Sequence, residues 1–502
     1  YMTRHYNDSH VEPPCDDNPF KSEDINETLK QMATILDLDP ELMAPDNPTV
    51  KQYMAQFQEE DRRAFQQYAT HIDCSNVTDI RIEILIAAKD GKDPTDGAFK
   101  LQPDEIPVTK EWIKIDSSQM RDLRNVSPDQ RSRCVAATAA EVEQLVKLGV
   151  FALVRADKVP GANPMDSQII WRIKYDSLGN YLKDKARLVM KGYQSKLGVG
   201  HFGVFSPMAT FITIRAMAIL AALQRRLLYS ADVPNAFGRA DINALTFAKL
   251  PSGISFEKDG ISSKDRNWLI RLLKSLYGLK GAPQMFHKLL QHFFVNILGY
   301  KCLKNDSSLY GRAWPPGSRT DVKVHAYNIV AADVDDMAIL SSHDDVLHEF
   351  HAALVKHFDV TDFGPMKSFF GVLFEDLQQG THKYYFLSAK KQIDSLFVKH
   401  TKLITHVKVD TPYLSGPVSN EQPLNEKETY ALVNYRSIVG GLIFPTTTCQ
   451  LDISYMAPYC ARYMANPKPE HVRRLIRVTD YLCHHRSVGL DLNPFDLSLI
   501  HI

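Results

Sequence analysis

The sequence lacks long hydrophobic runs and organised cysteines. No window of 18 or more apolar residues occurs in the 502 residues, and the first residues lack the charged-then-apolar order of a signal peptide. We therefore expect no membrane span and no secretion. None of the seven cysteines has a partner at CxxC spacing, which argues against a zinc site or a disulfide framework. A reducing, intracellular compartment is the simplest expectation. The cysteines stand at positions 15, 74, 134, 302, 449, 460 and 483.

Acidic residues are missing from one long stretch, 266–305, although the whole chain has 59 acidic and 59 basic residues. Seven Lys and Arg alternate there with six aromatic residues, a pattern that suits a nucleic-acid track. Residues 1–110 show the opposite bias, with 22 Asp and Glu against 11 Lys and Arg. The asymmetry indicates a basic functional body behind an acidic leader, or only the ordinary variation between domains.

The most unusual segment is 329–340, an apolar run that contains three carboxylates. It predicts two short strands, 329–332 and 337–340, joined by the turn Asp333-Val334-Asp335-Asp336. A turn without another role favours Asn-Gly or Asp-Gly. Adjacent carboxylates repel each other, and a hard cation such as Mg²⁺ relieves that repulsion. The segment therefore predicts a metal site suited to phosphate chemistry.

A second acidic position, Asp232, lies in Ser230–Phe237 at a predicted strand end. Alone, it is most simply a cap or a surface residue. Two-metal phosphoryl transfer, however, needs carboxylates from different strands around ions about 3.5–4 Å apart. Together with Asp335 and Asp336, Asp232 could complete such a site.

A basic hairpin is predicted from the strands 168–175 and 185–193. Residues 172–196 hold seven Lys and Arg against two Asp. Cations on a rigid hairpin can bind a triphosphate or a nucleic-acid backbone, although a solvated hairpin face is the plainer alternative.

Several of these segments occur in an order that resembles the reverse transcriptase of copia-type LTR retrotransposons. The resemblance covers roughly 135–490. The ordered motifs are KARLVMKGY (185–193), FSPMA (205–209), ADVPNAF (231–237), KSLYGLKGAP (274–283) and DVDDM (333–337).

The resemblance implies an α+β, right-hand polymerase fold of fingers, palm and thumb with an antiparallel palm sheet. It also implies an RNA-directed DNA polymerase that works on an RNA or DNA template-primer with deoxynucleoside triphosphates and two Mg²⁺ ions, or Mn²⁺ in their place. Carried over by position, the implied catalytic and metal-binding residues are Asp232, Asp335 and Asp336. The implied nucleotide and template residues are Lys174, Lys185, Arg187, Phe237 (which would exclude a 2′-hydroxyl), Lys280 and Gly281.

The sequence departs from the family pattern at the acidic turn. An aromatic residue, most often Tyr, usually precedes Val-Asp-Asp, whereas this chain has Asp333. A third acid there would repel the primer backbone. Two readings follow: a polymerase active in mechanism, or a catalytically inactive descendant that keeps the fold and nucleic-acid binding.

We expect three parts along the chain. Residues 1–130 form an acidic segment of unknown role, helical within 26–70 and otherwise linker. Residues 135–400 form the fingers, the palm and the start of the thumb, with helical patterns at 136–149, 212–228, 284–298 and 344–357. Residues 401–502 continue the thumb or connection with a helix at 472–484, and stop before any RNase H motif. By resemblance the protein acts in a cytoplasmic virus-like particle or in the nucleus; its oligomeric state is left open.

Overall fold

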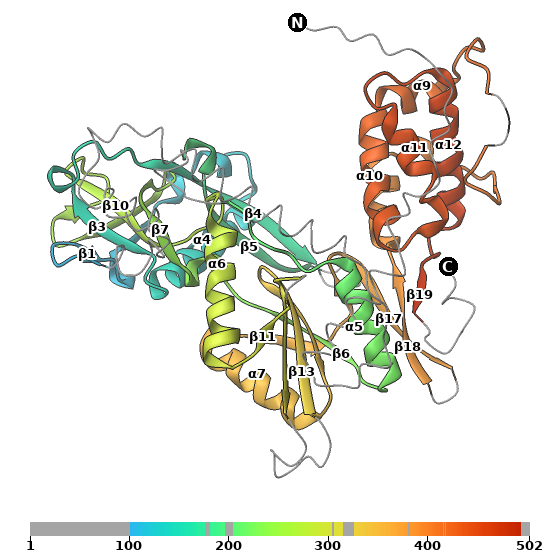
Figure 1. Ribbon diagram of the computed structural model, residues 1–502. Helices are drawn as coiled ribbons and strands as arrows, with labels where there is room; N and C mark the ends of the chain where they lie inside the picture. The colour runs from blue at the N-terminus through green and yellow to red at the C-terminus, as the bar shows by residue number, and fades with distance from the viewer. Residues whose placement is uncertain are drawn as a thin grey trace, which may run out of the picture.

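The computed structural model describes residues 101–175, 181–195, 204–303, 306–314, 326–379, 382–414, 416 and 418–492. The predicted helices within 26–70 lie outside these residues. The described chain forms three sheets of four or more strands and a small three-stranded sheet, with helices packed around them (Figure 1). None of its helices is long and apolar enough to cross a membrane.

The first sheet carries the basic hairpin. Its order is β1-β3-β10-β7-β4-β5, and only the β4–β7 pair is parallel. Helix α4 packs against β5, and a small sheet of β2, β8 and β9 lies beside α4. The bounds are β1 Ile106–Pro107, β2 Ile113–Ile115, α4 Pro128–Lys147, β3 Phe151–Arg155, β4 Met165–Tyr175, β5 Tyr181–Met190, β7 Asp241–Lys249, β8 Ile254–Lys258, β9 Ile261–Ser262 and β10 Trp268–Lys274.

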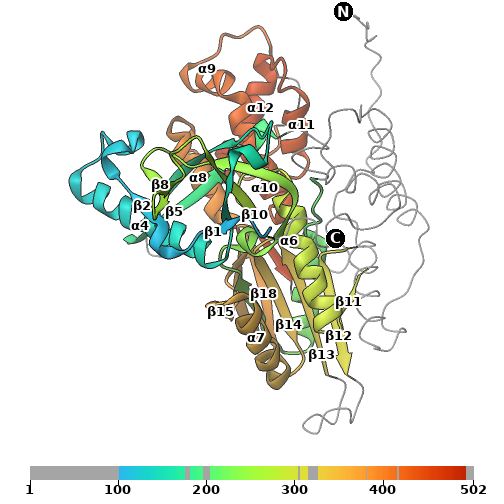
Figure 2. The same cartoon turned by 90° about the vertical axis from the view of Figure 1, so that its left-hand side faces the viewer.

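The second sheet carries the acidic turn and is antiparallel throughout. Its order is β11-β12-β13-β14-β6-β15. Helix α5 contributes to the core on one face, and α6 and α7 to the core on the other (Figure 1). In Figure 2, α6 and α7 face the viewer. The bounds are α5 Phe211–Leu223, β6 Leu228–Asp232, α6 Ala282–Gln291, β11 Lys301–Cys302, β12 Leu309–Trp314, β13 Ala326–Asp333, β14 Asp336–Ser341, α7 Asp344–Phe358 and β15 Asp362–Pro365.

A helical bundle with its own core follows a third sheet, of order β16-β17-β18-β19. The last strand returns to this sheet from the end of the bundle, so the bundle is tied at both ends. The bounds are β16 Ser368–Phe369, β17 Val372–Gln379, β18 His382–Ser388, α8 Lys390–Lys399, α9 Glu426–Val433, α10 Tyr435–Thr448, α11 Met456–Arg462, α12 Pro469–His484 and β19 Leu490–Leu492.

Short 3₁₀ segments connect these elements, and α6 continues directly into the π-helix η9 His292–Ile297. The 3₁₀ segments are η3 Lys110–Trp112, η4 Ser117–Gln119, η5 Arg121–Leu123, η6 Ala156–Lys158, η7 Gly192–Gln194, η8 Ala236–Arg239, η10 Thr401–Leu403 and η11 Leu451–Ile453.

The expected α+β class with antiparallel sheets is confirmed, and one helix boundary is corrected. The apolar run 212–228 predicted a helix to its end, but α5 stops at Leu223. Arg225 adopts a left-handed φ of 57°, which ends the helix, and Leu228 begins β6. The last residue of the predicted helix, Leu228, therefore belongs to a strand of the second sheet. The division of the chain into 1–130, 135–400 and 401–502 stays a prediction; β1 and β2, within the first of these parts, pair with β3 and β8.

Candidate active site

Four aspartates form one row across the second sheet. In the strand register Asp333 lies opposite Asp336, Asp336 opposite Asp232, and Asp232 opposite Asp362. Residues directly opposite in antiparallel strands have Cα atoms about 5 Å apart and point to the same face. The four side chains, here called the carboxylate row, thus lie side by side on β13, β14, β6 and β15. Asp335 stands next to the row in the turn.

The acidic turn has a strained backbone. Val334 has a φ of 52° at the first central position of a two-residue hairpin turn, where Gly is preferred. Such a conformation in a β-branched residue costs on the order of 1–3 kcal/mol and is found mostly at functional sites. The Val233 amide donates to the Asp335 carbonyl at 2.8 Å. This bond and the fully buried side chain of Met337 hold the turn against β6.

Burial and neighbouring negative charge raise the pKa values of Asp232, Asp333 and Asp336. Burial and the charge of Asp335 raise the pKa of Asp333 to about 6. Partial desolvation, then Asp335 and Asp232, raise that of Asp336 to about 6. Burial and Asp335 also raise the pKa of Asp232, while Lys185 and Lys174 oppose the shift. A site with these properties favours a bound cation.

The ligand atoms of the site are of the type that a hard divalent cation prefers, because all are carboxylate oxygens. Among the described residues no three Asp, Glu, His or Cys side chains converge closely enough to form a metal cluster. One oxygen of Asp333 is buried and has no hydrogen-bond partner within the described chain.

The basic hairpin presents its cations on one face. In the β4–β5 register Arg172 lies opposite Lys185, Lys174 opposite Lys183, and Ile170 opposite Arg187. The five cations, here called the basic face, are Arg172, Lys174, Lys183, Lys185 and Arg187. The other face packs on α4, where the Trp171 indole donates to the Cys134 carbonyl at 3.2 Å.

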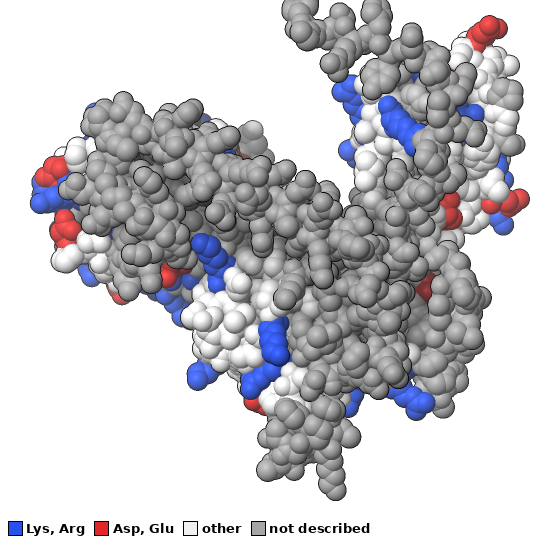
Figure 3. Space-filling model, in the orientation of Figure 1, with Lys and Arg blue, Asp and Glu red and all other residues white. Residues whose placement is uncertain are grey.

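Electrostatics links the basic face to the carboxylate row. Desolvation, then Arg187 and Lys174, lower the pKa of Lys185, and Asp232 opposes the shift. The predicted Lys174, Lys185 and Arg187 are thus brought within electrostatic reach of one another, and Lys174 and Lys185 within reach of Asp232. Figure 3 shows Lys and Arg side chains on the surface around α6.

An aromatic cluster joins the two surfaces. Phe237 in η8 lies edge-on to Tyr277 at 4.8 Å between ring centroids, and to Phe286 at 6.4 Å. The guanidinium carbon of Arg187 lies over the Tyr277 ring, 4.9 Å from its centroid. Phe237 and Arg187, which are far apart in sequence, are therefore bridged by one side chain.

The predicted Lys280 and Gly281 lie at the start of α6. Lys280 is exposed, and its Nζ donates to the Ser195 carbonyl at 3.3 Å. Gly281 is buried at the N-cap of α6, and its carbonyl accepts from the Met285 amide at 3.0 Å. They border the loop that carries Tyr277.

The sequence reasoning missed Asp362 and Tyr277. Asp362 stands in FDVTDFGP (358–365), which contains a short edge strand. The Gly and Pro in this segment make a strand hard to predict from the sequence. Tyr277 lies inside the motif KSLYGLKGAP, so the sequence could have singled it out. The sequence could not show which side chains its ring contacts.

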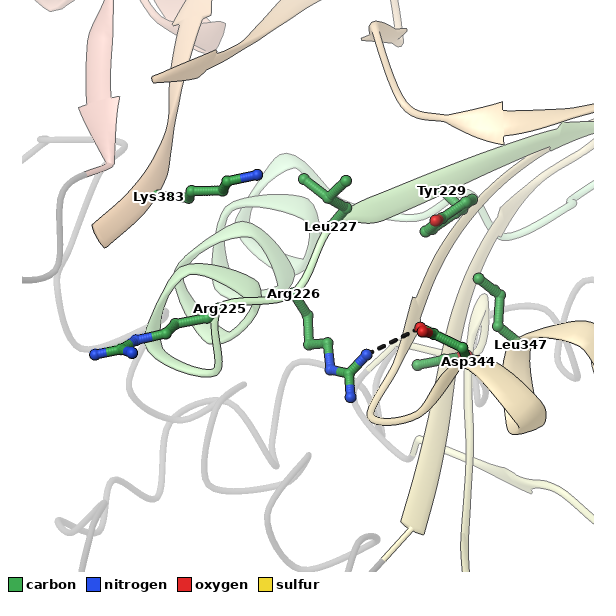
Figure 4. A pocket seen from close by; sticks show the side chains of 8 residues that line it. Arg225, Arg226, Leu227, Tyr229, Asp344, Leu347 and Lys383 are labelled. Atoms are coloured by element: carbon green, nitrogen blue, oxygen red, sulfur yellow. Dashed lines mark hydrogen bonds and ion pairs between the residues drawn. The ribbon is translucent and has the colours of Figure 1, made fainter. Parts of the chain in front are cut away.

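Two pockets lie outside this site. The one in Figure 4 is at the Leu228 end of β6, opposite to Asp232, and Arg226 pairs there with Asp344 at 3.0 Å. The other lies among α4, α6, η9 and the end of α7. No residue of the carboxylate row or basic face lines either pocket.

Comparison with known proteins identifies a family. The family described as reverse transcriptase (RNA-dependent DNA polymerase) matches residues 149–415. The chain is similar to two retrovirus-related Pol polyproteins. The one from transposon TNT 1-94 of Nicotiana tabacum is 27% identical over 75% of this chain, and the one from transposon RE1 of Arabidopsis thaliana is 29% identical over 66% of it. The chain spans 27% and 21% of those polyproteins, about a quarter of their length.

A solved structure of the foamy viral protease-reverse transcriptase in complex with double-stranded DNA aligns with 86% of this chain and 61% of its own. The identity is 12% and the TM-score 0.33, too low for the likeness to support an argument.

Proposed function

This chain belongs to the reverse transcriptase family, as the copia-type resemblance predicted, and from that premise we propose that it is the RNA-directed DNA polymerase of a retrotransposon. A primer 3′-hydroxyl would attack the α-phosphate of a deoxynucleoside triphosphate and release pyrophosphate. The observation that carries the proposal is the carboxylate row, which lies within electrostatic reach of the basic face.

Reverse transcriptases generally use divalent metal ions, and we propose that two Mg²⁺ ions, or Mn²⁺, bind this chain. Asp232, Asp335 and Asp336 would hold them, since they come from β6, the acidic turn and the start of β14 and offer only oxygen ligands. Bound ions would lower the pKa of the attacking hydroxyl and neutralise the charge of the departing pyrophosphate.

The remaining predicted residues would hold the nucleotide and template. Lys174, Lys185 and Arg187 would bind the triphosphate through charge-assisted hydrogen bonds. Phe237 would stand where a ribose 2′-hydroxyl would otherwise fit. Lys280 and Gly281 would line the nucleotide and template site at the start of α6, where the small Gly281 leaves room.

A second candidate function is nucleic-acid binding without catalysis, and Asp333 is the observation that favours it. Its enclosed oxygen adds negative charge beside Asp336, where a primer terminus would dock. Charge repulsion there would weaken docking even with the other carboxylates in place.

Primer extension on a homopolymer RNA template with Mg²⁺ or Mn²⁺ tests the proposal. We expect extension by the wild-type chain, and a loss of at least about 100-fold for Asp335→Asn. Asp410→Asn is the matched control, because Asp410 is exposed and distant in sequence from the site. Retained template-primer binding without any extension would instead establish the second function.

A further inference from the structure

Tyr277 lies where the basic face, Phe237 and the carboxylate row meet, and the proposed reaction leaves it without a role. We propose that the Tyr277 ring is a positioning residue that holds Arg187 and Phe237 in one fixed arrangement. It would thereby link triphosphate binding to selection of the sugar. This inference rests on the proposed function, because it concerns the same nucleotide site.

The first contact is with Arg187. Its guanidinium lies over the Tyr277 ring at 4.9 Å. The Nε of Arg187 is buried and makes no hydrogen bond within the described residues. A guanidinium that lacks this bond depends on other contacts for its orientation, and an aromatic face is a favourable one. The ring therefore helps to determine where the Arg187 charge lies.

The second contact is with Phe237. The two rings meet edge-to-face at 4.8 Å and 77°, the favoured geometry for an aromatic pair. The fully buried Phe286 also meets Phe237 edge-to-face, at 6.4 Å and 87°. Phe237 thus contacts two rings, and removal of Tyr277 would leave only the more distant one.

The backbone fixes the ring itself. The Tyr277 carbonyl accepts from the Met190 amide at 2.7 Å, which ties it to the end of β5. The next residue, Gly278, has a φ of 87°, and a Cβ there would lie 2.0 Å from the Met190 carbonyl oxygen. Because the loop and β5 are this close, the backbone that carries the ring cannot shift without moving the strand that carries Arg187.

The ring, and not the hydroxyl, carries this role. Within the described chain the Tyr277 hydroxyl makes no hydrogen bond, whereas both ring contacts are present. Burial and the charge of Asp335 raise its pKa to about 12, so the side chain is neutral near pH 7. Phenylalanine should therefore be able to replace tyrosine, whereas leucine, which is apolar but smaller and not aromatic, should not.

The test compares Tyr277→Leu with Tyr277→Phe in primer extension by the full chain. For Tyr277→Leu we expect KM for dNTP to rise about 5- to 20-fold, with kcat changed by less than about twofold. We also expect the preference for dNTP over rNTP to fall about fivefold, since Phe237 loses a support. Tyr277→Phe should match the wild type. Equal effects of the two substitutions, or a loss confined to kcat, would overturn the proposal.

Arg187→Lys provides a second variant that keeps the charge but loses the planar stacking group. Its KM effect should resemble that of Tyr277→Leu, and the double variant should show less than the sum of the two effects. Additive effects would contradict a shared arrangement.

Failure of the proposed function can be distinguished from failure of the positioning role of Tyr277. If the wild type extends no primer, binding of dTTP with Mg²⁺ to the protein–template-primer complex is measured by calorimetry. Wild type and Tyr277→Phe should bind at least about fivefold more tightly than Tyr277→Leu. Equal binding by all three, or no binding by any, would overturn the positioning role.

Discussion

Asp333 differs from its neighbours in the carboxylate row because one of its oxygens is enclosed without a partner in the described chain. Its pKa is raised to about 6 by burial and by Asp335, so near pH 7 it is mostly ionised beside Asp336. A buried carboxylate without a hydrogen bond is unfavourable on its own. At this position it would also repel a primer phosphate. We therefore expect Asp333 to lower both the stability of the protein and the docking of nucleic acid under the proposed function.

Asp333→Tyr is expected to raise affinity for template-primer about three- to tenfold, because it removes a charge and adds an aromatic surface. Fluorescence anisotropy with a labelled duplex measures the change, and primer extension should rise with it. Asp333→Asn is the control, since it removes the charge and adds no ring; it should give a smaller gain. If Asp333→Tyr lowers both affinity and extension, this account of Asp333 is wrong.

At the scale of elements, the two hairpins could be predicted from the sequence, whereas the strands that pair with them in the sheets could not. Alternating and apolar patterns located β4, β5, β13 and β14, because such patterns reflect local burial. The row from Asp333 to Asp362 depends on pairing of β6 with β14 and with β15. Those pairings are non-local, so no local pattern indicates Asp362. Likewise, the predicted helix 284–298 did not reveal its π-helical end, because the two helix types share similar apolar spacing over one turn.

The crossing of the Tyr277 loop over β5 is a second element that only the structure reveals. Gly192 and Gly278 face each other there: a Cβ on Gly192 would lie 1.9 Å from the Gly278 carbonyl oxygen. Both positions thus require the absence of a side chain. The contact fixes the basic hairpin to the loop that leads into α6.

Gly278→Ala should destabilise the protein by more than about 3 kcal/mol, since it adds a clash with Met190 to the strain of a positive φ. Gly260→Ala is the control that has the backbone strain without the clash, because Gly260 has a φ of 79° and an added Cβ would have nothing within 4 Å. It should cost only about 1 kcal/mol. Thermal unfolding followed by circular dichroism measures both. Equal shifts would show that the crossing is looser than described.

At the scale of the whole molecule, the helical bundle is joined to the second sheet through α5. Arg215 of α5 is 2% exposed and donates from Nη2 to the Thr448 carbonyl, and to that of Thr447 at 3.4 Å. These are the last carbonyls of α10, which no helical amide can satisfy. Burial lowers the pKa of Arg215 to about 10, so it remains a cation near pH 7 and favours the helix C-terminus. The opposite side of α5 shares a core with β6 and β13.

Arg215→Met should therefore loosen the bundle from the sheet that carries the carboxylate row. Leaving the buried Thr448 carbonyl without this hydrogen bond costs about 1–3 kcal/mol. If the bundle helps to hold template-primer, dissociation per added nucleotide should rise about threefold, while single-turnover addition stays unchanged. A processivity assay with a heparin trap measures the dissociation, and rapid-quench kinetics measure the single-turnover addition. Arg226→Met is the control, because among the described residues the Arg226 side chain forms an ion pair only with the exposed Asp344, at 3.0 Å. A lower melting temperature with normal processivity would mean that Arg215 stabilises the fold without linking the bundle to synthesis.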